Sequence, residues 1–160
     1  MGRSQPIQSP VPIGEAIIRG RRSIEDVPMN DEAILISTFV TPLKRKHLIE
    51  ILANPKRRHR ATAVLAHFHD LDPSAVVALE GAAQTPAAIE GALRSRGAGD
   101  RCHVISENRA IDGKTLSLKA ALEKVVGQGM GTLLSCVPGE LAYYEGEGPS
   151  DRCILARRAI

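Results

Sequence analysis

The chain has 160 residues, of which 43% are hydrophobic and 24% are charged, and its formal net charge is +3. A chain of this length can bury about 70% of the surface that it exposes when unfolded, so it needs neither a metal nor a disulfide to fold. No apolar run approaches the roughly 20 residues of a membrane-spanning helix, and the three cysteines form no C-x-x-C pair. We therefore expect a cytoplasmic protein with no metal, no cofactor and no contact with a membrane.

Residues 1–30 contain four prolines and show little hydrophobic periodicity. This composition predicts an extended or partly disordered arm. A run rich in β-branched residues at 33–40, between Asp31 and Pro42, predicts the first strand. The expected organisation is therefore an arm at 1–30 followed by a single α/β domain at 31–160.

Two pairs of a capping residue followed by proline predict two consecutive helices. Thr41-Pro42 begins a helix over about 42–53, and Asn54-Pro55 begins a second helix that extends to about residue 69. Apolar residues of the second helix recur at helical spacing, at Ala61, Val64, Leu65, Phe68 and Leu71.

Beyond this point the pattern alternates between strands and helices. It predicts a buried strand at 74–80, a helix after Thr85-Pro86, a strand at 101–106, a helix over about 117–126 and a final meander of three strands. Strands that alternate with helices are typical of parallel pairing. We therefore predict an α/β fold with a mixed, mostly parallel sheet of five or six strands, about four covering helices and an antiparallel C-terminal meander.

The sequence GQGMGT at 127–132 places three glycines after a helix and before a strand. A phosphate-binding loop needs the opposite order, in which the glycines precede a helix whose N-terminus faces the anion. The glycines are therefore predicted to end the helix, to form a tight turn and to let a second backbone segment approach closely.

The sequence HFHDLD at 67–72 is the densest cluster of potential metal ligands and proton-transfer groups. On a strand, residues 67 and 69 would share a face and could bind one ion, whereas on a helix they point about 200° apart. The apolar stripe favours the helix, and therefore a solvated helix end without a metal. The alternative is a small hydrolase or lyase, with Glu107 or Asp112 nearby, whose candidate catalytic residues are His67, His69, Asp70, Asp72 and Cys136.

Cys136 is a candidate nucleophile because it ends a predicted strand just before a turn. His103, on the neighbouring predicted strand, is its candidate base. Cysteines in apolar strands are more commonly buried and structural, so a structural role ranks above this hypothesis.

Residues 41–60 contain seven lysines and arginines but only one acidic residue, Glu50. Basic residues at the start of a helix oppose its dipole, so this charge is mildly unfavourable locally and indicates another purpose. The chain has only two Phe, two Tyr and no Trp, which argues against a binding mode that stacks bases. A charged, solvated face is the alternative to contact with a nucleic acid backbone or an acidic protein through Lys44, Arg45, Lys46, Lys56, Arg57, Arg58 and Arg60.

The acidic segment ELAYYEGEGPSD at 140–151 holds half of the aromatic residues. Acidic and basic surfaces on one chain could pair between copies in a homo-oligomer, with Tyr143 and Tyr144 as interface anchors. The sequence thus supports three hypotheses, in this order: a non-enzymatic binding or regulatory domain, a small hydrolase or lyase, and a self-assembling structural protein.

Overall fold

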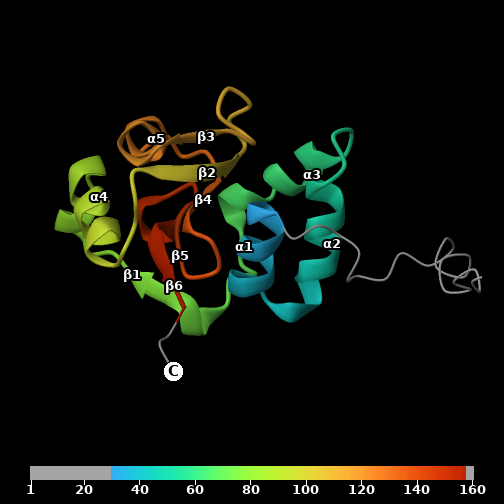
Figure 1. Cartoon of the computed structure of the whole chain (residues 1–160), viewed down its shortest axis with the longest axis horizontal. Coiled ribbons are helices and arrows are strands. Elements are labelled where there is room, and N and C mark those ends of the chain that lie inside the picture. Colours follow the sequence, from blue (N-terminus) through green and yellow to red (C-terminus); the bar gives the residue numbers. More distant parts are fainter. Residues whose placement is uncertain (1–29, 158–160) are drawn as a thin grey trace, which may run out of the picture.

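Six short strands form one sheet in the computed structural model, which describes residues 30–157 (Figure 1). In spatial order the sheet is β1-β6-β5-β4-β2-β3, and every neighbouring pair is antiparallel. The strands are β1 (Val76–Ala78), β2 (Arg101–Ser106), β3 (Thr115–Ser117), β4 (Thr132–Val137), β5 (Leu141–Glu145) and β6 (Cys153–Ala156).

The prediction of a mostly parallel sheet is wrong, because other strands lie between those that the helices connect. Helix α4 (Pro86–Ser95) leads from β1 to β2, but β6, β5 and β4 separate these two strands. Helix α5 (Leu118–Val125) leads from β3 to β4, and β2 lies between them. Each helix therefore connects two strands that run in the same direction without being neighbours, and the fold is α+β.

The segment predicted as the first strand is instead a helix, α1 (Asp31–Phe39). The side chain of Asn30 caps this helix by accepting a 2.8 Å hydrogen bond from the amide of Ala33. The acidic residues Asp31 and Glu32 occupy its first turn, where negative charge suits the helix dipole. The cap and the acidic turn outweigh the modest helix propensity of the β-branched residues that follow.

Three elements confirm their predictions closely. Helix α2 (Pro42–Leu52) begins directly after Thr41, and β2 occupies the predicted range 101–106. Helix α4 begins after Thr85, whose hydroxyl accepts a 3.2 Å hydrogen bond from the amide of Ala88. Local capping signals therefore locate these helix starts correctly.

The second predicted helix is much shorter than expected, because α3 spans only Arg58–Thr62. A helix that reached residue 69 would need the carbonyl of Leu65, which has another partner. The hydroxyl of Tyr144 donates to the carbonyl of Leu65, and the amide of Glu147 donates to the carbonyl of Ala66 at 3.0 Å. Strand β5 and the segment after it thus satisfy these two carbonyl groups through tertiary hydrogen bonds.

The glycines after α5 act as predicted. Gly127 follows the C-cap residue Val126 and has a φ of +83°, a left-handed conformation that favours glycine. Gly131 lies so close to the 65–66 segment that a Cβ atom would overlap the amide nitrogen of Ala66 and the carbonyl carbon of Leu65. The start of β4 is therefore pressed directly against the segment that follows α3.

Helices cover both faces of the sheet, so the protein has a separate core on each face (Figure 1). Helices α1, α2 and α3 pack on one face, and α4 and α5 pack on the other. Consecutive residues of β5 alternate between the two cores: Tyr144 belongs to the first and Tyr143 to the second. This alternation follows from the two-residue period of a strand.

Both edges of the sheet are short strands. The strand predicted as buried at 74–80 is reduced to β1, where Val76 is 39% exposed. The opposite edge, β3, was not predicted; it lies between the predicted strand at 101–106 and the predicted helix over about 117–126. The arm predicted at 1–30 falls outside the described residues, apart from the N-cap Asn30. Among the helices of residues 30–157, none is long and apolar enough to cross a membrane.

Candidate functional site

The seven basic residues predicted to bind an anion fall into two groups. Arg45 and Arg58 are partly buried and bonded: Arg45 Nε donates to the carbonyl of Val40 at 2.7 Å, and Arg58 belongs to a network of ion pairs. The prediction that all seven are available to an anion is therefore corrected for these two. The other five are exposed, and their side chains make no hydrogen bond or ion pair within residues 30–157; they are Lys44, Lys46, Lys56, Arg57 and Arg60.

Arg58 connects two carboxylates from distant parts of the chain. Its Nη1 and Nη2 each donate to one oxygen of Glu32 at 2.6 Å, and its Nε and Nη2 donate to Asp112 at 2.7 and 2.9 Å. Hydrogen bonds to Glu32 and then to Asp112 raise the pKa of Arg58. Such two-pronged pairs are among the strongest charge-assisted contacts in proteins. They tie α1, α3 and the loop between β2 and β3 together.

His103 extends this network from β2. Its Nε2 lies 2.8 Å from a carboxylate oxygen of Glu32. Burial opposes ionisation of Glu32, but hydrogen bonds from Arg58 and His103 outweigh it and lower the pKa of Glu32 to about 2. Glu32 is therefore an anion at neutral pH.

An open pocket of about 410 Å³ lies beside His103 and is lined by Asn30, Asp31, Glu32 and His103. On the other side of the imidazole, Nδ1 lies 3.5 Å from the hydroxyl of Thr115, at the outer limit of a hydrogen bond. Within residues 30–157, Thr115 is the only hydrogen-bonding neighbour of Nδ1. The carboxylates of Asp31 and Glu32 also line this pocket.

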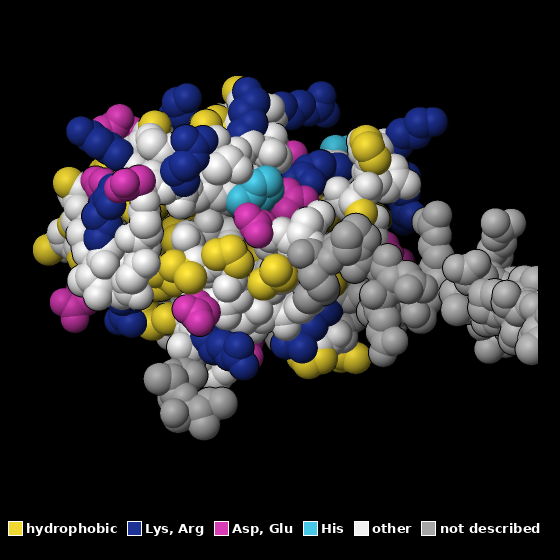
Figure 2. Space-filling view, viewed as in Figure 1, with side chains coloured by type: hydrophobic (Ala, Val, Ile, Leu, Met, Phe, Trp, Pro, Cys, Tyr) yellow, Lys and Arg dark blue, Asp and Glu magenta, His cyan; other side chains and the backbone are white. Residues whose placement is uncertain are grey.

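The contact between Arg58 and Asp112 brings a second basic segment to α3. Arg109 and Lys114 flank Asp112 in the loop between β2 and β3; both are exposed, and their side chains have no bonding partner within residues 30–157. Figure 2 shows Lys and Arg side chains at the end of the molecule formed by this loop and α3. We use the term basic surface for seven exposed residues: Lys44, Lys46, Lys56, Arg57, Arg60, Arg109 and Lys114.

Sequence reasoning missed Arg109 and Lys114 because they lie about fifty positions after α3. The link between the two segments, Arg58 to Asp112, spans 54 residues. No local pattern predicts such a contact, since either residue could pair with many others in the chain. The pairing of Arg58 with Glu32 and Asp112 is evident only in the folded chain.

The two histidines of HFHDLD do not form a site with their neighbours. His67 ends a short 3-10 helix (Leu65–His67), and its Nε2 lies 3.0 Å from an oxygen of Glu147, with both side chains more than 60% exposed. His69 is exposed, in a segment that is neither helix nor strand, so the prediction of a helix through this residue is wrong. Within residues 30–157, no three His, Cys, Asp or Glu side chains are placed to hold a metal ion.

The two aspartates of HFHDLD belong to a structured turn. The carbonyl of Asp70 accepts a 2.8 Å hydrogen bond from the amide of Thr41. The carboxylate of Asp72 accepts hydrogen bonds from the amide and the hydroxyl of Ser74, at 3.0 and 2.8 Å. These bonds lower the pKa of Asp72, the hydroxyl having the larger effect. The aspartates fix the path of the chain between α3 and β1.

Cys136 and His103 lie on opposite faces of the sheet. Cys136 packs in the core beneath α4 and α5, whereas His103 points toward α1, where it bonds Glu32. Burial raises the pKa of the Cys136 thiol to about 12, so the reactive thiolate is disfavoured at neutral pH. The structure therefore does not bring this nucleophile and its candidate base together.

Tyr143 and Tyr144 are core residues, with exposed fractions of 0% and 3%. The hydroxyl of Tyr143 donates to Glu145 at 2.7 Å, and the hydroxyl of Tyr144 donates to the carbonyl of Leu65. Neither ring is available to anchor an interface, because helices cover both faces of β5. Their alternation in a covered strand explains why an acidic hairpin can contain two buried rings.

No protein-family model, no curated protein and no solved structure matches the chain.

Proposed function

We propose that the chain is a cytoplasmic binding domain that contacts the phosphate backbone of a nucleic acid through the basic surface. One observation carries the proposal: seven exposed cations without a bonding partner within residues 30–157 lie on α2, on α3 and next to α3, and on the loop that Arg58 links to α3. By contrast, Arg58, Arg94 and Arg152 are each paired with a carboxylate. Cations without an internal partner keep their full attraction for an external polyanion and gain from the release of its counterions.

The shape of the basic surface favours contact with a backbone over contact with bases. Helix α2 has 11 residues, which corresponds to a length of about 16 Å. Lys44 and Lys46 point about 200° apart on this helix, so one backbone would contact only one of them together with the cations of α3. All four aromatic rings of the chain are at most 8% exposed, so no ring is available for base stacking. Phosphate contacts of this kind position a nucleic acid without recognising its sequence.

The ion-pair network supports the proposal indirectly. Arg58 holds the loop between β2 and β3 against α3 through Asp112, and so keeps Arg109 and Lys114 at the same end of the molecule as Arg57. We therefore assign Arg58 a positioning role and no direct contact with the anion. The three cysteines are free thiols, which agrees with a reducing cytoplasm.

Fluorescence anisotropy with a short labelled DNA duplex, measured over a series of salt concentrations, tests the proposal. We expect the logarithm of the association constant to fall linearly with the logarithm of the salt concentration, with a slope of about −4.5 if five phosphates are contacted. The triple variant Lys56→Gln, Arg57→Gln, Arg60→Gln should weaken binding and reduce the magnitude of this slope by about 2.7.

The matched control removes the same charge from the opposite face of the sheet. Arg96, Lys119 and Lys124 are exposed residues at the end of α4 and on α5, so the variant Arg96→Gln, Lys119→Gln, Lys124→Gln should keep the slope of the unmodified chain. Equal losses in both triple variants, binding that does not depend on salt, or no binding at low salt would each contradict the proposal. Binding to polyglutamate but not to DNA would indicate an acidic protein partner instead.

A further inference from the structure

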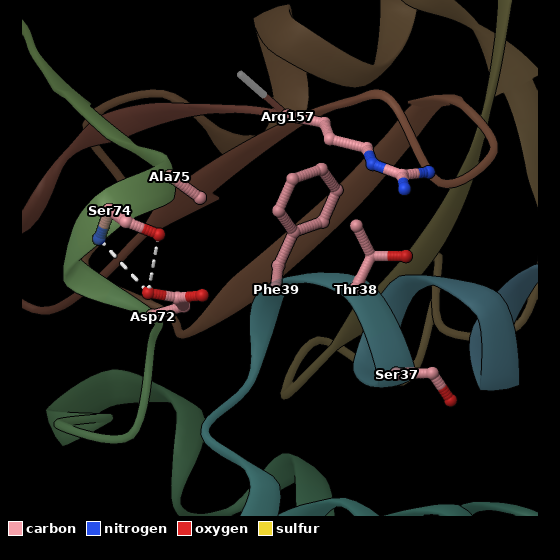
Figure 3. A pocket seen from close by; sticks show the side chains of 7 residues that line it. All are labelled: Ser37, Thr38, Phe39, Asp72, Ser74, Ala75 and Arg157. Carbon is pink, nitrogen blue, oxygen red and sulfur yellow. Dashed lines mark hydrogen bonds between the residues drawn. The ribbon is translucent and has the colours of Figure 1, made fainter. Parts of the chain in front are cut away.

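A second candidate site lies where the end of α1 meets the turn before β1 and the residue after β6. A pocket of about 390 Å³ opens there, a volume in the range of small-molecule sites. Figure 3 shows Arg157 and Thr38 on one side of the pocket, Asp72 and Ser74 on the other, and the ring of Phe39 between them.

The two charged walls carry opposite signs. Asp72 uses only one carboxylate oxygen, Oδ1, to bond Ser74, and its Oδ2 has no hydrogen-bond partner within residues 30–157. The hydrogen bonds from Ser74 lower the pKa of Asp72, and the charge of Arg45 adds to this effect without forming an ion pair. The exposed guanidinium of Arg157 also has no hydrogen bond or ion pair within the described residues.

Backbone hydrogen bonds hold both walls in place. The amide of Asp72 donates to the carbonyl of Phe39 at 2.7 Å, and Val40 forms an isolated bridge with Leu71. The amide of Arg157 donates to the carbonyl of Glu140 at 2.9 Å. Because these bonds fix the backbone on both sides of the pocket, binding would require little ordering of the main chain.

We infer that this pocket binds a small zwitterion, such as a free amino acid, whose carboxylate faces Arg157 and whose ammonium group faces Asp72. Only a ligand with both charges matches both walls. A simple anion would place a negative charge near Asp72, and a simple cation would place a positive charge near Arg157. The hydroxyl of Thr38 donates to the carbonyl of Ile34 at 2.8 Å, so its oxygen can still accept a hydrogen bond from the ligand.

Amide chemical shifts of the full chain, recorded by NMR during titration, test this inference. The probes are glycine, β-alanine and γ-aminobutyrate, which hold their two charges at increasing separation. We expect saturable shifts at Thr38, Asp72 and Arg157 with at least one probe. Butyrate and butylamine, each with one of the two charges, should bind at least about tenfold more weakly than γ-aminobutyrate if that probe binds.

Two conservative variants test the walls separately. Arg157→Gln keeps the amide that bonds Glu140, and Asp72→Asn keeps an acceptor for Ser74, so both should fold. Each should lower the affinity about tenfold or more, whereas Arg157→Lys should restore part of it and Arg96→Gln should change nothing. The inference is overturned if no zwitterion gives saturable shifts up to about 10 mM, if single-charge analogues bind as tightly as zwitterions, or if neither wall variant changes the affinity.

Discussion

Arg57 and Arg58 are adjacent and chemically identical, yet they have different roles. Arg57 is exposed and has no bonding partner among the described residues, whereas the guanidinium of Arg58 makes four hydrogen bonds to two carboxylates. The side chains of Arg58 and Glu32 are only 19% and 11% exposed. At this scale the function of a charge depends on whether an opposite charge is already beside it.

Replacing Arg58 should destabilise the fold strongly. The variant Arg58→Gln leaves Glu32 and Asp112 partly buried without their cation, which should cost about 3 kcal/mol of unfolding free energy. Urea unfolding of both forms measures this difference. Arg57→Gln is the matched control, and its effect should stay within about 0.5 kcal/mol because Arg57 is exposed. Similar losses in the two variants would show that Arg58 is not a structural residue.

Protonation of Glu32 in acid should lower the free energy of unfolding. The pKa of Glu32 is about 2 in the folded protein and 4.5 as the reference value. Its stabilising effect is therefore complete above the unfolded-state pKa and is lost as the pH falls from there toward the folded-state pKa, by about 2 kcal/mol at pH 3. Urea unfolding at pH 6 and pH 3 should show the stability difference between the natural chain and Glu32→Gln narrowing by about this amount. Parallel pH profiles would contradict the assignment.

Helix starts and helix ends have different origins in this protein. Side chains at Asn30, Thr85 and Ser117 accept hydrogen bonds from the first turns of α1, α4 and α5, so a local signal begins each of these helices. After α3, the carbonyls of Leu65 and Ala66 accept hydrogen bonds from Tyr144 and Glu147, so tertiary contacts fix the path of the chain where a longer helix was predicted. An element can thus begin for local reasons and end for tertiary ones.

Gly131 should be irreplaceable even by alanine. A Cβ at this position would overlap backbone atoms of Leu65 and Ala66, and backbone atoms have little freedom to move. Gly131→Ala should therefore destabilise the fold by about 3 kcal/mol or more, as measured by thermal or urea unfolding.

Replacement of a second glycine, Gly91, should change the stability in the opposite direction. Gly91 lies on the exposed side of α4, and a Cβ there would meet no atom within 4 Å. Gly91→Ala should therefore stabilise the protein by up to about 1 kcal/mol, the difference in helix propensity between the two residues. An unchanged stability in Gly131→Ala would mean that β4 and the segment after α3 are not in close contact.

At the scale of the whole molecule, the order of the strands and the placement of charge determine which distant segments meet and where an anion could bind. The last three strands are inserted between β1 and β2, which brings the segment after β5 against the end of α3. The contact between Arg58 and Asp112 brings exposed cations of the loop between β2 and β3 close to those of α3, although the chain has a net charge of only +3. A polyanion would therefore meet a local field that the total charge does not reveal.

The sequence by itself determined the starts of α2, α4 and α5, the position of β2, and the role of the glycines after α5. These features depend on caps, on periodicity and on backbone conformation, which act over a few residues. Asn30 is also a residue type that favours the N-cap of a helix, but the β-branched residues after it predicted a strand instead.

Only the tertiary structure decided which strands are neighbours, where α3 ends and which cations are free. Strand order depends on the insertion of β6, β5 and β4 between strands that are adjacent along the chain. Arg58 resembles Arg57 in sequence, and only Glu32 and Asp112, 26 and 54 positions away, distinguish the two. Contacts at such separations depend on the path of the whole chain, so local propensity and pattern carry no information about them.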